Sequence, residues 1–145
     1  MAALALVGTF GLGLGVLAAM GQFRVKELSR MTVEELEKRV AASRDGAVWC
    51  AYGDKLREAG QFGAAVKAYE KAVEFGPELV EARLNAGVAL AQANNPDAFF
   101  AYVGRLAINY PKVAVDLMER GEVRGLRGDA RWGPAEAGAR AQAVD

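Results

Sequence analysis

The sequence predicts an all-α fold in which a single transmembrane helix precedes a short stack of helical hairpins. Two observations support this prediction. The first 23 residues contain no charged side chain. Further along, a spacing recurs: Gly87 lies thirty-four residues after Gly53, and Pro111 lies thirty-four residues after Pro77. A period of that length, with small and large apolar residues at set offsets, is typical of antiparallel helix pairs stacked side by side.

The composition argues against nucleic-acid, metal and cofactor chemistry. Lysine and arginine total 18 and aspartate and glutamate also total 18, so no net field draws the chain toward nucleic acid. Histidine is absent, which removes the commonest general base and metal ligand. Cys50 is the only cysteine and cannot form an internal disulfide or a thiolate cluster. We therefore expect no metal, no cofactor and no nucleic-acid partner.

The titratable residues predict no catalytic site. Asp54 and Glu58 are four residues apart beside Lys55 and Arg57, a pattern typical of a solvated helix face. Cys50 has no histidine to activate it as a nucleophile. The sequence therefore indicates that the protein is not an enzyme.

Residues 1–23 are long and apolar enough for one membrane-spanning helix, roughly 33 Å at 1.5 Å per residue. A signal peptide cut after Ala18 and a buried core helix are the two alternatives. Arg24, Lys26 and Arg30 follow the apolar segment, and no basic side chain precedes it. The positive-inside rule then predicts a single-pass protein with its C-terminal domain in the cytoplasm. We expect the membrane to be the bacterial inner membrane.

Small residues recur along one face of this predicted helix, at Gly8, Gly11, Gly15 and Ala19. Small residues let helix backbones approach closely in lipid, where no hydrophobic effect brings helices together. We expect this face to pack on an integral membrane protein or on a second copy within the lipid bilayer. The alternative is an anchor that contains glycine with no partner.

Residues 24–45 are expected to form a linker and a capping helix. Thr32 and Glu35 have the spacing of a capping box, in which each residue bonds the backbone amide of the other. Leu36 and Val40 give the following helix an apolar stripe. Asp45 is then expected to cap the next helix.

Residues 46–79 resemble a tetratricopeptide repeat, and almost every signature position is filled. The residues that carry the resemblance are Trp49, Tyr52, Gly53, Leu56, Phe62, Ala65, Tyr69, Ala72 and Pro77. Residues 80–113 resemble a second, degenerate repeat that keeps Gly87 and Leu90, so two repeats are expected within residues 46–111. Arg83 stands where a large apolar residue is usual, and Phe99 stands where alanine is usual. Asn95 and Pro96 predict a helix start, with Asn95 as the cap and proline in the first turn.

Residues 112–132 are expected to close the stack, because a terminal unit must offer a polar outer face. They divide into a capping helix and a segment that folds back, with Leu126 and Trp132 as apolar anchors. Residues 133–145 are rich in alanine and glycine and are expected to form an extended tail.

The resemblance implies a concave groove that binds a protein partner. First-helix side chains would line it: Ala47, Cys50, Asp54, Arg57, Glu81, Leu84, Asn85, Val88 and Gln92. This mixed, mildly apolar lining suits a helix or an extended segment of another protein. In the alternative, the helix after Thr32 or the C-terminal tail fills the groove from within.

These features favour a non-catalytic, membrane-anchored scaffold. It would be an accessory subunit that stabilises or tethers a bacterial membrane complex, respiratory or photosynthetic, through protein–protein contacts. One alternative is a transient assembly or recruitment factor, such as a cytochrome-maturation or localisation adaptor. Another is a secreted repeat protein with a cleaved leader.

Overall fold

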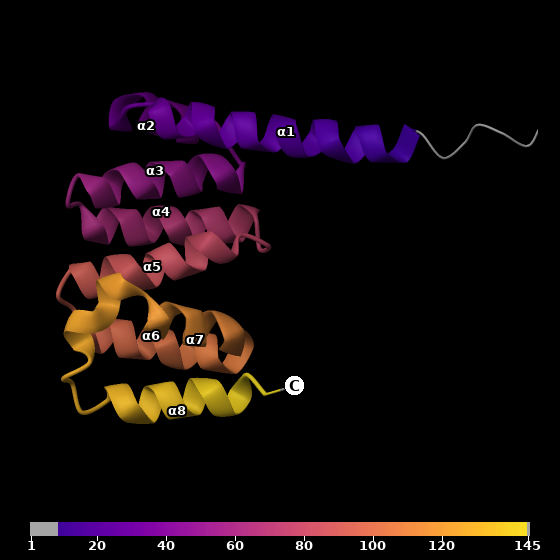
Figure 1. The fold of residues 1–145 in the computed structure, drawn as a ribbon. Coiled ribbons are helices and arrows are strands. Elements are labelled where there is room, and N and C mark those ends of the chain that lie inside the picture. The colour runs from indigo at the N-terminus through magenta and orange to yellow at the C-terminus, as the bar shows by residue number, and fades with distance from the viewer. Residues whose placement is uncertain (1–8, 145) are drawn as a thin grey trace, which may run out of the picture.

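A computed structural model describes residues 9–144, with side chains from residue 19 onward. In that part the protein is all-α and contains no strand. The helices lie in layers from α1 to α8 (Figure 1). In chain order they are α1 (Thr9–Arg30), α2 (Val33–Val40), α3 (Gly46–Glu58), α4 (Phe62–Phe75), α5 (Val80–Gln92), α6 (Pro96–Asn109), α7 (Pro111–Glu119), the 3-10 helix η1 (Gly121–Leu126) and α8 (Trp132–Gln142).

Helix α1 differs from the prediction of a span ending at residue 23 and followed by a linker. It continues through the charged Arg24, Lys26 and Glu27 as far as Arg30. The reason is that its last turns pack on the body, where Leu28 is buried against α2 and α3. Among residues 9–144, no helix has the length and apolarity needed to cross a membrane.

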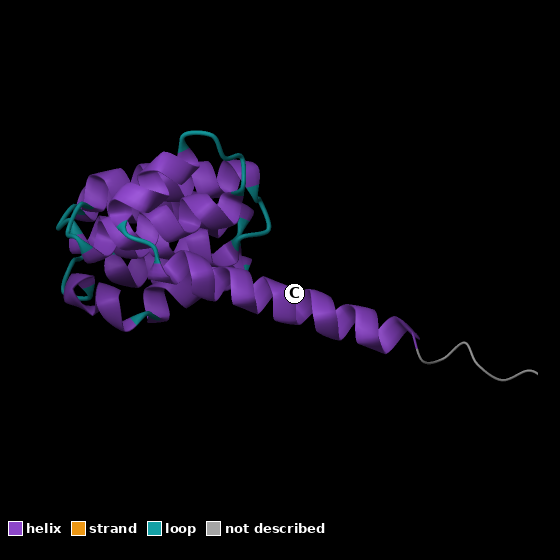
Figure 2. Cartoon of the chain, turned by 90° about the horizontal axis from the view of Figure 1, so that it is seen from above, coloured by secondary structure: helices purple, strands orange, loops and turns teal. Residues whose placement is uncertain are grey.

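The N-terminal part of α1 projects away from the helical stack (Figures 1 and 2). Met20, Phe23 and Val25 have 64%, 73% and 64% of their surface exposed, and Ala19 is also exposed. Of the predicted small-residue face, Gly11 and Gly15 lie within α1, whereas Gly8 lies outside the described residues.

The predicted helix starts are confirmed. Thr32 Oγ1 accepts from the Glu35 amide at 3.2 Å, and Glu35 Oε2 accepts from the Thr32 amide at 2.8 Å, which completes the capping box of α2. The Asp45 side chain caps α3, and Asn95 caps α6 with Pro96 in its first turn. Each cap satisfies amide groups that have no partner within their own helix.

The first hairpin, α3 with α4, packs closely because its contact residues are small. A Cβ on Gly53 would lie 2.6 Å from the ring of Tyr69, so only glycine admits that ring. Tyr69, Ala65 and Ala72 are fully buried. The hairpin thus has the tight form that the repeat resemblance implies.

The second hairpin, α5 with α6, is repacked around Phe99. The Phe99 ring is fully buried and stacks on Trp132 at the start of α8, with centroids 6.4 Å apart. On α5, Gly87 lies under the buried side chain of Leu117 from α7. Phe99 therefore packs against the C-terminal fold-back segment, where Trp132 provides the expected anchor.

The prediction of an extended tail over residues 133–145 is wrong, because α8 runs from Trp132 to Gln142. Its sequence is rich in alanine, a strong helix former. Buried apolar residues of α5, α6, α7, η1 and α8 form one cluster, which we call the C-terminal core. Ala139 is fully buried in it, and Arg140 pairs with Glu119 of α7 at 3.0 Å. Tertiary contacts with α6 and α7 stabilise this helix.

Candidate partner-binding groove

An apolar hollow of about 310 Å³ lies between the last turns of α1 and the face of α3. We call it the α1–α3 groove. Its apolar lining residues are Val25, Leu28, Ala47, Cys50, Ala51 and Leu79, and its polar lining residues are Ser29, Asp54, Lys55, Glu58 and Glu81.

Some of the residues predicted for the partner groove do line this hollow. Cys50 and Asp54 contribute from α3, together with Ala47, and Glu81 contributes from the start of α5. The groove is therefore built chiefly on the first repeat, with α1 as one wall.

Val25 and Leu28 were not predicted to line a groove, because they fall in the segment expected to be a linker. Their spacing of three residues was a usable signal of a continuing helix face.

The α5 half of the predicted groove is closed. Leu84 and Val88 are only 5% and 1% exposed and belong to the C-terminal core, so no partner can reach them. Helix α7 and the 3-10 helix η1 both pack across α5. Neither the helix after Thr32 nor the tail fills this half. The 112–132 segment does.

Three more predicted groove residues take part in a hydrogen-bond network that joins α3, α4 and α5. Tyr69 Oη and Asn85 Nδ2 both donate to Asp54 Oδ1, at 2.6 Å and 3.0 Å. Arg57 Nε donates to Tyr69 Oη at 3.3 Å, and Arg57 Nη1 donates to Gln92 Oε1 at 3.4 Å. Asn85, Arg57 and Gln92 therefore connect the two repeats.

The same network shifts the pKa values of Asp54 and Tyr69. Burial raises the pKa of the Asp54 carboxyl, although hydrogen bonds from Tyr69 and Asn85 and the charge of Arg57 oppose the shift. Burial, followed by the hydrogen bond to Asp54, raises the pKa of Tyr69. The phenol therefore stays protonated and acts as a donor.

Cys50 lies on the apolar floor as a free, half-buried thiol. Burial, followed by the negative charges of Asp54 and Glu81, raises its pKa to about 12. A thiolate is the nucleophilic form, so this cysteine is chemically quiet at neutral pH. Its side chain contributes an apolar surface to the groove.

The rim of the groove carries more negative than positive charge. Asp54, Glu58 and Glu81 face a single cation, Lys55, among the residues that line it. Lys55 pairs with Glu58 at 3.3 Å, and Glu81 pairs with Arg120 at 3.2 Å. An apolar floor with an acidic rim complements a partner segment that carries both apolar and basic side chains.

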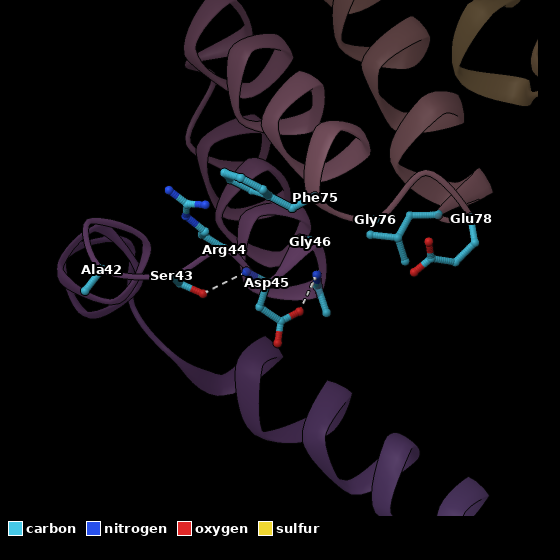
Figure 3. Close-up of a pocket in the computed structure, with 10 residues that line it drawn as sticks. Ala42, Ser43, Arg44, Asp45, Gly46, Phe75, Gly76 and Glu78 are labelled. Carbon is cyan, nitrogen blue, oxygen red and sulfur yellow. Dashed lines mark hydrogen bonds between the residues drawn. The ribbon is translucent and has the colours of Figure 1, made fainter.

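A separate hollow lies at the start of α3 (Figure 3). Hydrogen bonds and an ion pair there connect α3 to the loop before it and to α1. Ser43 Oγ accepts from the Asp45 amide at 3.1 Å, and Asp45 Oδ1 accepts from the Ala47 amide at 2.9 Å. Asp45 also forms an ion pair with Arg24 of α1. These polar groups cap α3 and hold α1 against it, which fixes one wall of the groove.

Comparison with known proteins identifies the repeat. The family model described as TPR repeat matches residues 53–94, from the second half of α3 through α5. This segment is therefore similar to tetratricopeptide repeats, which indicates a protein–protein interaction scaffold. No curated protein and no solved structure matches the chain.

Proposed function

Because residues 53–94 match a TPR repeat, we propose that this chain is a non-catalytic scaffold that holds a protein partner in the α1–α3 groove. We propose further that it is anchored in the bacterial inner membrane by its N-terminal segment. In that setting it would be an accessory subunit that tethers or stabilises a membrane protein complex.

The observation that carries the proposal is the α1–α3 groove itself. The C-terminal segment buries the α5 side of the stack, whereas the α3 side keeps an accessible apolar floor with an acidic rim. A concave, largely apolar site edged by a few polar groups is the usual form of a binding site. Cys50 is chemically quiet, so the chemistry of the groove suits binding.

Two features support the membrane anchor. Residues 1–23 contain no charged side chain, and the N-terminal part of α1 leaves the stack (Figure 2). Met20 and Phe23 on this part of the helix are exposed. Exposed apolar side chains of this size, next to basic residues such as Arg24 and Lys26, suit the boundary between lipid and cytoplasm. With this geometry, the α1–α3 groove would lie near the membrane surface.

Site-specific photo-crosslinking in native membranes tests the groove. A benzophenone amino acid replaces Val25, which lines the groove and is 64% exposed, so the fold should tolerate it. The matched control places the same group at Val144, which is exposed at the opposite end of the stack. We expect one discrete crosslinked protein from position 25 only. The same crosslinked products at both positions, or none at position 25, would refute the proposal that a partner protein binds in the α1–α3 groove.

Membrane fractionation tests the anchor separately. The parent chain should remain in the membrane pellet after carbonate extraction. A Leu12→Arg, Leu17→Arg double variant should move to the supernatant, because central arginines cost about 2.5–3.5 kcal/mol each on insertion scales. A parent chain that is released by carbonate contradicts the anchor and leaves the groove result unaffected.

A further inference from the structure

A second cavity, of about 290 Å³, lies on the other side of α5 from the α1–α3 groove. Side chains of α4, α5 and α6 line it, together with Tyr110 after α6. Helix α5 separates the two sites, because Glu81 lines the groove whereas Arg83 and Ala86 line the cavity. We call this second site the Arg83 cavity.

Arg83 is unusual because it is a buried cation with no carboxylate partner. Only 5% of its surface is exposed, and its Nη1 donates to the carbonyl oxygen of Pro77. Its guanidinium carbon lies 4.0 Å from the centroid of the Tyr110 ring. No ion pair joins Arg83 to any carboxylate within residues 19–144. Burying a charge without a counter-charge is costly, so its retention needs an explanation.

Arg83 lines the cavity, and some of its guanidinium nitrogens donate to no acceptor among the described residues. In the described part of the chain, every fully buried side-chain nitrogen or oxygen has a hydrogen-bond partner. The guanidinium nitrogens that donate to no protein acceptor must therefore reach solvent, and Arg83 is one of the cavity's lining residues. A guanidinium presents its donors as a planar fork, which matches the two oxygens of a carboxylate.

A second guanidinium lies at the same cavity. Arg105 is exposed, and its guanidinium carbon lies 5.6 Å from the centroid of the Tyr102 ring. Tyr102 Oη donates to the Arg83 carbonyl oxygen at 2.8 Å and so ties α6 to α5. Burial raises the pKa of Tyr102 to about 12, and the charges of Arg83 and Arg105 oppose this shift, which agrees with two cations near one phenol.

Charge and shape together define what the cavity fits. Among the described residues that line it, Glu70 is the single carboxylate, so two arginines leave one positive charge in excess. The rest of the lining is largely apolar, including Val73, Leu106 and the Tyr110 ring. One excess positive charge beside an apolar surface is complementary to a ligand group with a single negative charge and an adjacent apolar side chain.

We propose that the Arg83 cavity binds an acidic side chain of a partner protein, with an adjacent apolar side chain of that partner packed on the Tyr102 and Tyr110 rings. The carboxylate neutralises Arg83 and receives a second donor from Arg105. This site goes beyond the proposed function, because it lies on a different face and needs neither the α1–α3 groove nor the membrane anchor.

An NMR titration of the full-length chain in mild detergent tests the proposal. The probe is the capped dipeptide acetyl-Phe-Glu-amide, and its isosteric control is acetyl-Phe-Gln-amide. We expect the glutamate probe to bind about tenfold more tightly, because a charge-assisted hydrogen bond adds more than a neutral one. The shifts should centre on Arg83, Tyr102 and Arg105. Equal affinities for the two probes, or shifts centred elsewhere, would overturn the proposal.

Variants separate recognition from folding. Arg105→Gln removes an exposed cation, so the variant should keep the fold. It should bind the glutamate probe several-fold more weakly than the parent chain does. Arg83→Lys keeps the charge but loses the planar fork, and it should weaken the probe while the unfolding midpoint confirms a folded protein. Arg124→Gln, which removes an exposed arginine from η1, is the matched control and should leave binding unchanged. An equal loss of affinity in all three variants would show that the probe is attracted by positive charge in general, and it would refute binding in the Arg83 cavity.

Discussion

Gly87 of α5 lies directly beneath Leu117 of α7, so closely that a Cβ added to the glycine would overlap the leucine side chain. This contact lets α7 cross α5. It thereby buries Leu84 and Val88, which the repeat pattern had placed in an open groove. One small residue thus helps to decide which half of the groove a partner can reach.

Substitution of Gly87 tests this packing. Gly87→Ala should destabilise the protein by ~1–2 kcal/mol in urea unfolding, because the overlap with buried Leu117 exceeds the gain in helix propensity. Gly63→Ala in α4 is the matched control, since a Cβ there meets no atom within 4 Å. It should stabilise the protein by up to ~1 kcal/mol. A Gly87→Ala variant as stable as Gly63→Ala would contradict the close approach.

Asp54 should make stability depend on pH. Burial raises its pKa in the folded state, so protonation favours folding. Its stabilising contribution is full at low pH and is lost as the pH rises through the folded pKa. Asp54→Asn keeps an oxygen that accepts from Tyr69 and Asn85 and removes the charge. The unfolding free energy of Asp54→Asn relative to the parent should therefore increase between pH ~4 and ~7.

The control for this prediction is Asp116→Asn, which removes an exposed carboxylate from α7. Denaturant unfolding of both variants over the same pH range is the measurement. If the two variants show the same pH dependence, the raised pKa of Asp54 has no consequence for stability.

The thiol of Cys50 should react slowly in the folded protein. Its pKa of about 12 leaves little thiolate at pH ~8, so we expect alkylation by iodoacetamide at least ~10-fold slower than for free cysteine. In urea the rate should rise to the ordinary value, because unfolding removes the burial. Folded protein that reacts as fast as unfolded protein would show that Cys50 is neither desolvated nor near the charges of Asp54 and Glu81.

The small residues of α1 are predicted to pack on a membrane partner. Gly11→Ile together with Gly15→Ile should detach the protein from its partner without releasing it from the bilayer, because larger side chains keep helix backbones apart. Co-purification from detergent extracts and membrane fractionation measure the two properties separately. If the double variant co-purifies with the partner as well as the parent chain does, the proposal that this face packs on the partner is refuted.

Stoichiometric retention after gentle detergent extraction separates a permanent subunit from a transient assembly factor. A subunit should remain with its complex at a constant ratio through purification. An assembly factor should be present in fractions of immature complex and absent from the final one.

Much of the fold could be predicted because it depends on local signals. The capping box at Thr32, the Asn95 and Pro96 helix start and the fit of Gly53 to Tyr69 each reflect contacts within one helix or one hairpin. Periodicity and turn chemistry record such contacts directly. The repeat itself could therefore be predicted from the sequence.

The candidate sites were less predictable. Cys50 and Asp54 were expected in a groove and do line one, but the wall made by Val25 and Leu28 was missed because charges on α1 suggested a linker. Arg83 was recognised only as a departure from the repeat pattern. Its place in a cavity with Arg105 and Tyr102 depends on three helices meeting, which the chain order does not reveal.

The amino-acid sequence by itself determined the helical hairpins, their caps and the apolar character of the N-terminal segment. These depend on interactions between residues a few positions apart. Only the tertiary structure decided that α7 and η1 close the α5 half of the groove and that α1 borders the other half. The tertiary structure also decided that the segment expected to be an extended tail forms helix α8. These outcomes depend on the competition of distant segments for the same apolar surface, which is settled by shape and packing rather than by local pattern.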